Sequence, residues 1–461
     1  MKPNTKLLTL LLMMITSISS FAQNNLSPKY DERVELLSVV FRLAKSPEYI
    51  NNAVKLHADA ADVYFRKYNN HEVVQLAQKL RKKRGVGYDA VMSMAIHLEI
   101  KNNSVYFNPQ LNKEGLDDRW GNYSEEFVLA LRRFYLESKF NTFFKANQKM
   151  YGLACERFQS VSNEINIEWF EEFFGHKPKG QYHLVVGLLH RGNYGPKYET
   201  KSGEENIYSI LSAYKVDSTG YPVFEKYQKG TLVHEFCHSF CNPLGEKYYT
   251  NMESKASDLF ASVATIMRKQ AYGSAQIMIN EILVRASTIR YFEDNGASKD
   301  VVEKLLTAEK SKGFLWIDKL YKALERYSSN RSKYPTLNDF MPEIVKIQNK
   351  LSVDELLSEF KSNCPKIIHT SLKRGTNNVS TSLKEIIVEY DKPMASYGIS
   401  DKGKQPKMDL EWQNKERTIL CIRVELEPNT KYLLDFRSVF NEDKEGFPLQ
   451  ESFELDFTTG E

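Results

Sequence analysis

The chain has 461 residues, of which 42% are hydrophobic, 26% charged and 12% aromatic, a composition typical of packed globular proteins. Only 22 glycines and 15 prolines are present, which excludes a collagen-like or low-complexity chain. The 63 Lys and Arg residues nearly balance the 59 Asp and Glu residues. We therefore expect no nucleic-acid partner and no attraction to an anionic membrane.

Residues 1–22 are typical of a secretory signal peptide. Two lysines precede an apolar run over residues 7–18, and Ser20 and Ala22 supply small side chains before a cleavage site. The run is too short to span a hydrocarbon core of ~30 Å, which favours cleavage over a retained anchor. No other stretch has spanning length. The sequence therefore predicts an exported protein, periplasmic, cell-surface or secreted, without a transmembrane segment once the signal is removed.

The cysteines are too few for a disulfide framework in a chain of this length, and their odd number leaves at least one unpaired. Cys237 and Cys241 are four residues apart, a spacing at which helical disulfides are rarely well formed, and we expect these two to be small buried apolar side chains. The five cysteines are Cys155, Cys237, Cys241, Cys364 and Cys421.

From residue 31 to about residue 360 the apolar periodicity is mostly helical, for example at Val91, Met94 and Leu98. Two strand-like runs interrupt it, at residues 182–189 and 207–216. We assign residues 27–360 to one mainly helical domain with a small mixed sheet.

The pattern changes after Cys364, where short β-type runs alternate with turn residues. These runs cover residues 385–390, 418–425, 432–436 and 453–457. Such spacing is typical of a small antiparallel sandwich, which we assign to residues 364–461. The predicted fold class is therefore α+β, with an all-β C-terminal domain.

Residues 234–238 read His-Glu-Phe-Cys-His, an HExxH motif. On a helix, His234 and His238 lie one turn apart and present both imidazoles to one metal ion. Glu235 lies beside them, where its carboxylate can take a proton from a metal-bound water as general base. The pattern predicts one zinc ion per chain.

The residues around the motif are apolar, and no charge other than Glu235 occurs over residues 231–240. This helix should therefore be buried, and buried unpaired polar groups cost ~1–3 kcal/mol each. Zinc with a bound water would satisfy the two imidazoles and the carboxylate. The alternatives are two core histidines satisfied by backbone carbonyls, or a metal site without catalysis.

Catalytic zinc needs a third protein ligand and an open fourth position. The HExxHxxGxxH form is absent, so we expect an acidic ligand on a later helix. Glu281 is favoured because apolar residues surround it in the helical run 275–291, where a carboxylate must coordinate, pair or be protonated. Glu253 and Asp258 remain as alternatives.

Further groups could assist catalysis. Arg285 lies one turn after Glu281 and would either face a substrate oxyanion, as a catalytic residue, or form an ordinary i,i+4 ion pair. Three tyrosines are weaker candidate donors, namely Tyr248, Tyr249 and Tyr291.

Pro243 predicts that the motif helix ends near Cys241 and Asn242, because proline cannot donate the next helical hydrogen bond. Asn242 would then either orient a metal ligand or cap the helix. Upstream of the helix, the strand over residues 207–216 is expected to be an edge strand that pairs with an extended peptide.

With these residues in view, the chain resembles DUF4932, an uncharacterised Bacteroidetes family, over about residues 30–345. The resemblance depends on the opening VVFRLAKSPEY, the two strands, the block HEFCHSFCNP and the helix NEILVRA. The family looks like an HExxH zinc metallopeptidase of the gluzincin type. This resemblance implies a zincin-like domain with His234, His238 and Glu281 as ligands and Glu235 as general base. The NExxxD sequence of the best-known gluzincins is absent at its usual short spacing.

The C-terminal residues resemble a bacterial Ig-like module of the S-layer type, through VEYDKPM, LEPNTKYLLDF and FELDFTTG. This resemblance implies a domain that spaces its neighbour or docks to a neighbouring domain or cell-surface component.

The leading hypothesis is an exported zinc metallopeptidase that acts on a peptide or protein substrate. One alternative is a non-catalytic cell-surface binding protein, for glycan or protein, on a degenerate peptidase scaffold. A second is a zinc hydrolase acting on a different amide, such as cell-wall peptide.

Overall fold

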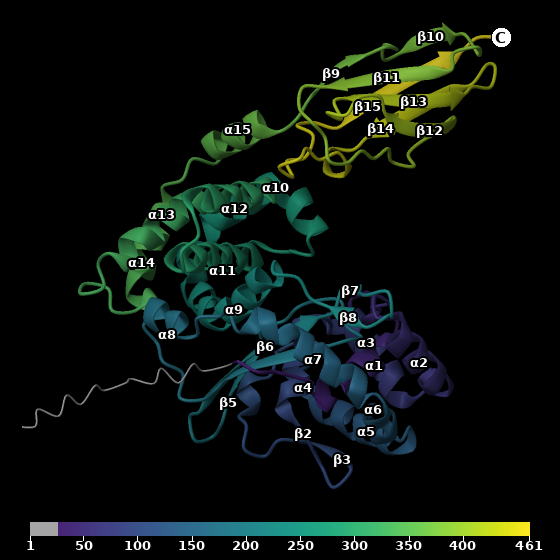
Figure 1. Ribbon diagram of the computed structural model, residues 1–461. Coiled ribbons are helices and arrows are strands. Elements are labelled where there is room, and N and C mark those ends of the chain that lie inside the picture. Colours follow the sequence, from purple (N-terminus) through teal and green to yellow (C-terminus); the bar gives the residue numbers. More distant parts are fainter. Residues whose placement is uncertain (1–25) are drawn as a thin grey trace, which may run out of the picture.

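The structure, a computed structural model, describes residues 26–461 (Figure 1). The predicted signal peptide lies outside the described residues. The helices of residues 26–363 are α1 Glu32–Leu43, α2 Lys55–Phe65, α3 Glu72–Arg84, α4 Asp89–His97, α5 Ser124–Glu137, α6 Phe140–Ala146, α7 Gln148–Ser162, α8 Glu168–Phe174, α9 Gln228–Tyr248, α10 Glu253–Lys269, α11 Ala275–Asp294, α12 Lys299–Ser311, α13 Ile317–Ser328, α14 Leu337–Asn349 and α15 Val353–Asn363.

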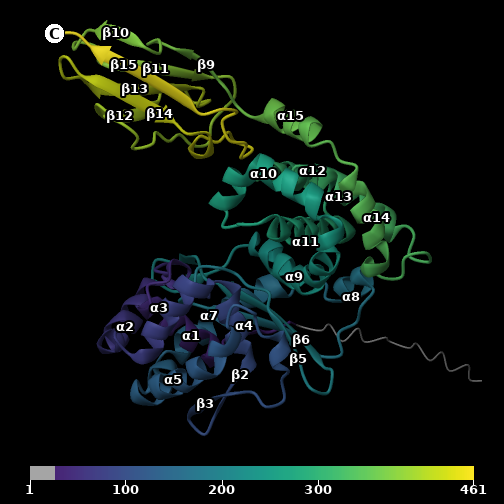
Figure 2. The ribbon, with the colours of Figure 1, turned by 180° about the vertical axis from the view of Figure 1, so that it is seen from behind.

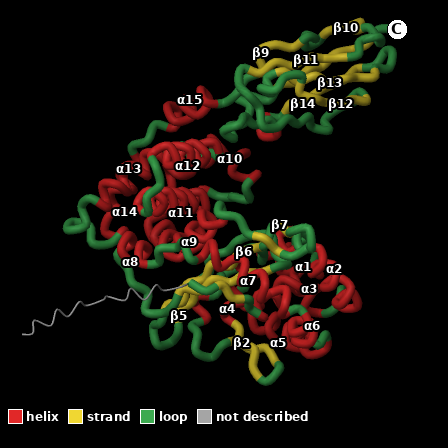
Figure 3. The backbone as a smooth tube through the Cα atoms, viewed as in Figure 1, coloured by secondary structure: helices red, strands yellow, loops and turns green. Residues whose placement is uncertain are grey.

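The strands of this part are short. They are β1 Pro28–Lys29, β2 Leu98–Lys101, β3 Ser104–Phe107, β4 Tyr182–Gly187, β5 Lys197–Glu199, β6 Glu205–Ser212, β7 Lys215–Val216 and β8 Pro222–Val223. Helices and small sheets thus occur together, and the predicted α+β class is confirmed (Figure 3).

The first helices, α1 to α7, gather around the small sheet, and α9 to α14 form the middle of the molecule (Figures 1 and 2). The sheet has the order β1-β4-β6-β5, with β1, β4 and β6 parallel and β5 antiparallel. Helix α9 packs against β6 and α11. The motif helix therefore lies between the sheet and the later helices.

The expectation that residues 207–216 form an edge strand is wrong. Strand β6 ends at Ser212 and lies between β4 and β5. The turn before β5 folds back, so Tyr194 and Ile210 exchange backbone hydrogen bonds of 3.0 and 2.8 Å. Because both sides of β6 are paired, the short strand β5 is the edge on this side of the sheet and β1 is the edge on the other.

Two further local predictions differ from the structure. Leu98, assigned to a helix by its spacing, begins the β2–β3 hairpin instead, because Asn102 and Asn103 form its turn at φ of 52° and 56°. The strand predicted at residues 182–189 ends at Gly187.

The C-terminal region is rich in strands. These are β9 Ile367–Thr370, β10 Thr376–Val379, β11 Glu385–Tyr390, β12 Lys407–Trp412, β13 Ile419–Glu425, β14 Lys431–Phe436 and β15 Phe453–Thr459. They form two sheets, in the orders β12-β13-β11-β9 and β10-β15-β14. Apolar side chains from both sheets share one buried cluster, separate from the large cluster of the helical part.

One loop of this region contacts the helices. Phe447 packs against Phe360 of α15, with ring centroids 5.6 Å apart, and belongs to the large helical cluster. Lys269, at the end of α10, pairs with Glu442 and donates to the carbonyl oxygen of Val439. The loop between β14 and β15 therefore joins the two parts.

All five cysteines are unpaired, and Cys237 and Cys241 are buried, which confirms the prediction for these two. Cys155 is partly exposed. Within residues 26–461, no helix combines the length and apolar character needed to cross a membrane.

Candidate metal centre

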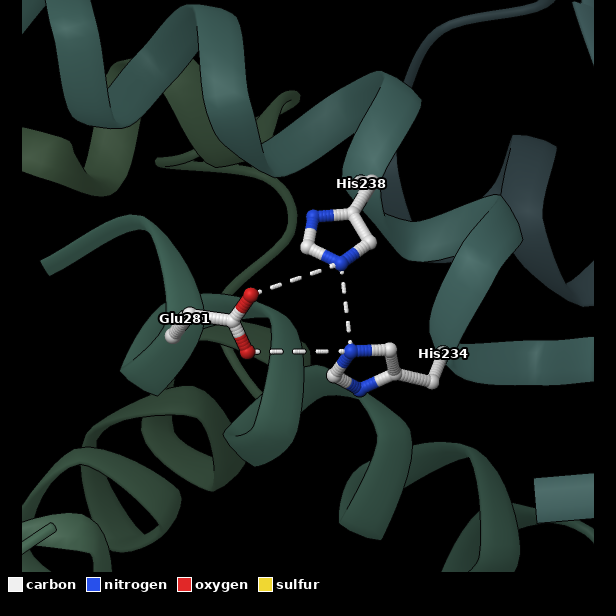
Figure 4. Close-up of side chains that lie close together, drawn as sticks. All are labelled: His234, His238 and Glu281. Carbon is white, nitrogen blue, oxygen red and sulfur yellow. Dashed lines mark hydrogen bonds and ion pairs between the residues drawn. The ribbon is translucent and has the colours of Figure 1, made fainter. Parts of the chain in front are cut away.

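The HExxH motif lies in the middle of α9, as its spacing predicts. The apolar residues Leu232, Val233, Phe236 and Cys237 are fully buried and fix the rotation of the helix. The two histidines project together from another face, and His234 Nε2 lies 3.1 Å from His238 Nε2 (Figure 4).

Helix α11 supplies the third group. Glu281 places Oε1 3.6 Å from His238 Nε2 and Oε2 3.7 Å from His234 Nε2. Figure 4 shows the carboxylate turned toward both imidazoles. Within residues 26–461 this is the one cluster of three or more His, Cys, Asp or Glu side chains whose ligand atoms converge closely enough for a metal ion.

Close packing of α9 against α11 makes this convergence possible. A Cβ on Gly245 would lie 2.1 Å from Asn280 Oδ1, so the two helices nearly touch there. At the next contact Cys241 Sγ lies 3.7 Å from Ser287 Oγ. Cys241 precedes Gly245 on α9, whereas its partner Ser287 follows Asn280 on α11. The two helices therefore run antiparallel.

The donor set fits zinc. Bonds of about 2.0–2.2 Å at tetrahedral angles place ligand atoms ~3.3–3.6 Å apart. The observed separations are 3.1 Å between the two imidazole nitrogens and 3.6 Å from His238 Nε2 to Glu281 Oε1. His238 Nδ1 lies 3.1 Å from Asn242 Oδ1. An amide oxygen only accepts, so this contact assigns the proton to Nδ1 and leaves the Nε2 lone pair for a metal.

The surroundings of the two imidazoles shift their pKa values in opposite directions. Burial lowers the pKa of His234 well below its ordinary value, and the charges of His238 and Arg285 lower it further. Burial also disfavours the charged form of His238, but the carboxylates of Glu281 and Glu235 outweigh it and raise its pKa. The lowered pKa therefore favours the neutral form of His234, which is the form that binds a metal.

Glu235 is buried beside this cluster. Burial raises the pKa of Glu235 to about 7, with His238 opposing the rise and Glu281 adding to it. This carboxylate is thus available to exchange a proton near neutral pH.

The alternative third ligands lie elsewhere. Glu253 and Asp258 are on α10, both are exposed, and neither belongs to the converging cluster. The favoured residue, Glu281, is the one that the fold brings to the histidines.

Arg285 lies against Glu281, but it also has other partners. Its Nη2 lies 3.2 Å from Glu281 Oε2, and its Nη1 donates to Glu309 Oε2 at 2.5 Å. The i,i+4 ion pair is therefore formed, while contact with a substrate oxyanion stays a prediction.

The three candidate tyrosines are used for packing. Tyr248 donates to the carbonyl oxygen of Asn338, and the hydroxyl of Tyr291 accepts from the backbone N–H of Asn166. Tyr249 packs against the helical core.

The motif helix does not end at Cys241 and Asn242. It continues through Pro243 to Tyr248, because Gly245 packs closely on α11 and Tyr248 bonds to α14. These contacts offset the ~3 kcal/mol that an internal proline costs. Asn242 therefore caps nothing and contacts His238 instead.

The sequence did not predict Tyr272, which donates a 3.1 Å hydrogen bond to Glu281 Oε2. It lies in the turn between α10 and α11, outside both helical patterns. A tyrosine shortly before the helix that carries Glu281 was the only signal, and it is a weak one.

The backbone of the loop before β5 lies directly on α9. A Cβ at Gly195 would lie 2.1 Å from the carbonyl oxygen of Glu235 and 3.2 Å from His238 Cβ. Only glycine allows this approach without a shift of the loop or the helix.

We therefore expect Gly195→Ala to lower the free energy of unfolding by ~1–3 kcal/mol, the usual range for an overpacked interior. Urea unfolding followed by circular dichroism measures this change. The matched control is Gly152→Ala on α7, where a Cβ meets nothing within 4 Å. Equal stability of the two variants would contradict the close approach.

An α+β fold in which two packed helices bring two imidazoles and a carboxylate to one point defines a protein with a candidate three-ligand metal centre. The chain belongs to the family described as Domain of unknown function (DUF4932), which matches residues 26–347. This match confirms the predicted family for the helical part. No curated protein and no solved structure matches the chain.

Proposed function

We propose that the protein is an exported zinc-dependent metallopeptidase. The observation that carries the proposal is the convergence of His234, His238 and Glu281, with Glu235 buried on the same helix. Two histidines and one carboxylate are the ligand set of several catalytic zinc sites, which keep a fourth position open.

A zinc ion held there would polarise a substrate carbonyl and make water acidic enough to attack near neutral pH. Glu235 is the general base, which takes the proton from the attacking water and then passes it to the leaving amine. Its raised pKa, about 7, suits a group that must both accept and donate a proton. Asn242 holds the imidazole of His238 in the required tautomer.

The proposal includes a zincin-like helical domain and an Ig-like C-terminal domain. A ligand helix packed on a small sheet, followed by a later helix with the third ligand, supports a zincin-like domain of the gluzincin type. The order β9-β11-β13-β12 corresponds to the A-B-E-D sheet of an Ig-like sandwich. The contact through Phe447 supports a docking role for that sandwich.

Removal of zinc with a chelator, followed by its restoration, tests the proposed activity. We expect the chain without residues 1–22 to cleave casein or peptidoglycan fragments, to stop after zinc is removed, and to recover when zinc is restored. Cleavage of casein alone supports a peptidase, and cleavage of peptidoglycan fragments alone supports a cell-wall amidase.

The matched control for this experiment is Glu235→Gln, which distinguishes hydrolysis by this site from hydrolysis by a contaminating enzyme. Chelator-resistant cleavage that persists in the variant would contradict the proposal. A chain that carries zinc but cleaves neither substrate class would favour the non-catalytic binding protein.

A further inference from the structure

Glu281 is held by two neighbours on one side of its carboxylate. Oε2 accepts a hydrogen bond from Tyr272 at 3.1 Å and lies 3.2 Å from Arg285 Nη2. Arg285 Nη2 also donates to the Tyr272 hydroxyl at 2.8 Å. Tyr272 and Arg285 thus contact each other as well as Oε2. Oε2 also lies 3.7 Å from His234 Nε2, whereas Oε1 lies 3.6 Å from His238 Nε2.

The turn between α10 and α11 brings Tyr272 to this position. Ala271 adopts the left-handed conformation, at φ 68°, and the backbone N–H of Tyr272 donates to the carbonyl oxygen of Met267 at 3.0 Å. This hydrogen bond folds the chain back at the end of α10. The phenol therefore reaches a carboxylate nine residues further along the chain.

Arg285 is in turn fixed by groups on and beyond α12. Its Nη1 donates to Glu309 Oε2, and Lys312 Nζ donates to Glu309 Oε1 at 2.9 Å. The guanidinium also lies over the ring of Phe314, with Cζ 4.6 Å from the ring centroid. Both terminal nitrogens of Arg285 are thus engaged within the protein.

We propose that Tyr272 and Arg285 are positioning residues that fix Glu281 so that it presents Oε1 alone to the metal. This inference rests on the proposed zinc site. A carboxylate with one oxygen committed to two donors binds a metal through the other, which keeps the coordination number low. A low coordination number leaves a position open for water and substrate.

The alternative for Arg285, contact with a substrate oxyanion, would require it to leave both Glu281 and Glu309. Glu281 is buried and Glu309 is partly buried, and separating such pairs leaves charges without partners. The geometry therefore favours a positioning role over a catalytic one.

Zinc affinity of Tyr272→Phe tests the proposal, because this variant removes one hydroxyl and keeps the ring. Competition with a chromophoric chelator should show binding about 10–100-fold weaker than in the wild type, the usual effect of a lost outer hydrogen bond. The matched control is Tyr248→Phe, which removes a 3.2 Å hydrogen bond to Asn338 at the end of α9. This control should change the affinity by less than about twofold.

Two further readouts separate positioning from general stability. The cobalt-loaded Tyr272→Phe protein should absorb visible light more weakly than the wild type, because release of Oε2 raises the coordination number. Arg285→Lys should retain only part of the wild-type zinc affinity, since one ammonium cannot contact Tyr272, Glu281 and Glu309 together.

Wild-type zinc affinity in Tyr272→Phe would overturn the positioning role while leaving the peptidase proposal intact. Equal weakening in Tyr272→Phe and Tyr248→Phe would also overturn it, because the effect would then be structural. Absence of zinc binding in the wild type would overturn both proposals.

Discussion

The Glu235→Gln protein is expected to bind zinc as the wild type does and to lose about 10²–10⁴-fold in turnover, the range for general acid–base catalysis. Glutamine has nearly the same shape, so the buried position beside His234 is kept. It cannot take a proton from water or return one to the leaving amine. Steady-state cleavage rates, measured beside the zinc content of the same sample, check both parts.

The matched control is Glu246→Gln, the same change at an exposed position of α9. It should leave rate and zinc content unchanged. Hydrolysis retained in Glu235→Gln would remove this residue from the mechanism. Loss of zinc together with activity would instead make Glu235 a metal ligand.

His238→Ala and Glu281→Ala are each expected to reduce the zinc content from about one per chain to near none, because a three-ligand site loses a required donor. In the structure these two side chains come from different helices and meet at 3.6 Å. Mass spectrometry of the purified chain, without residues 1–22, measures the metal directly.

The alternative ligands provide the controls. Glu253→Ala and Asp258→Ala change exposed residues outside the cluster and should keep the zinc. Zinc lost with His238→Ala and retained with Glu281→Ala would move the third ligand to another carboxylate. A wild-type chain that takes up no zinc would leave the binding scaffold as the working hypothesis.

The sequence by itself determined the local part of the site. Helical periodicity places His234 and His238 on one face whatever the surrounding fold, since residues four apart are neighbours on any helix. The apolar neighbours of Glu281 predicted its burial, and its burial singled it out from Glu253 and Asp258.

Only the tertiary structure decided the features that depend on distant segments. Strand β6 became interior because the chain returned to pair Tyr194 with Ile210. Helix α9 continued past Pro243 because residues beyond it pack on α11 and α14. No sequence pattern records either pairing.

The surroundings of Glu281 show the same division. The i,i+4 spacing of Arg285 predicts the ion pair, because both residues lie on one helix. The contacts with Tyr272 and Glu309 arise from a turn and from a separate helix. Local spacing fixes what one helix presents, whereas packing between helices decides which groups meet there, and that packing depends on side chains far apart in the chain.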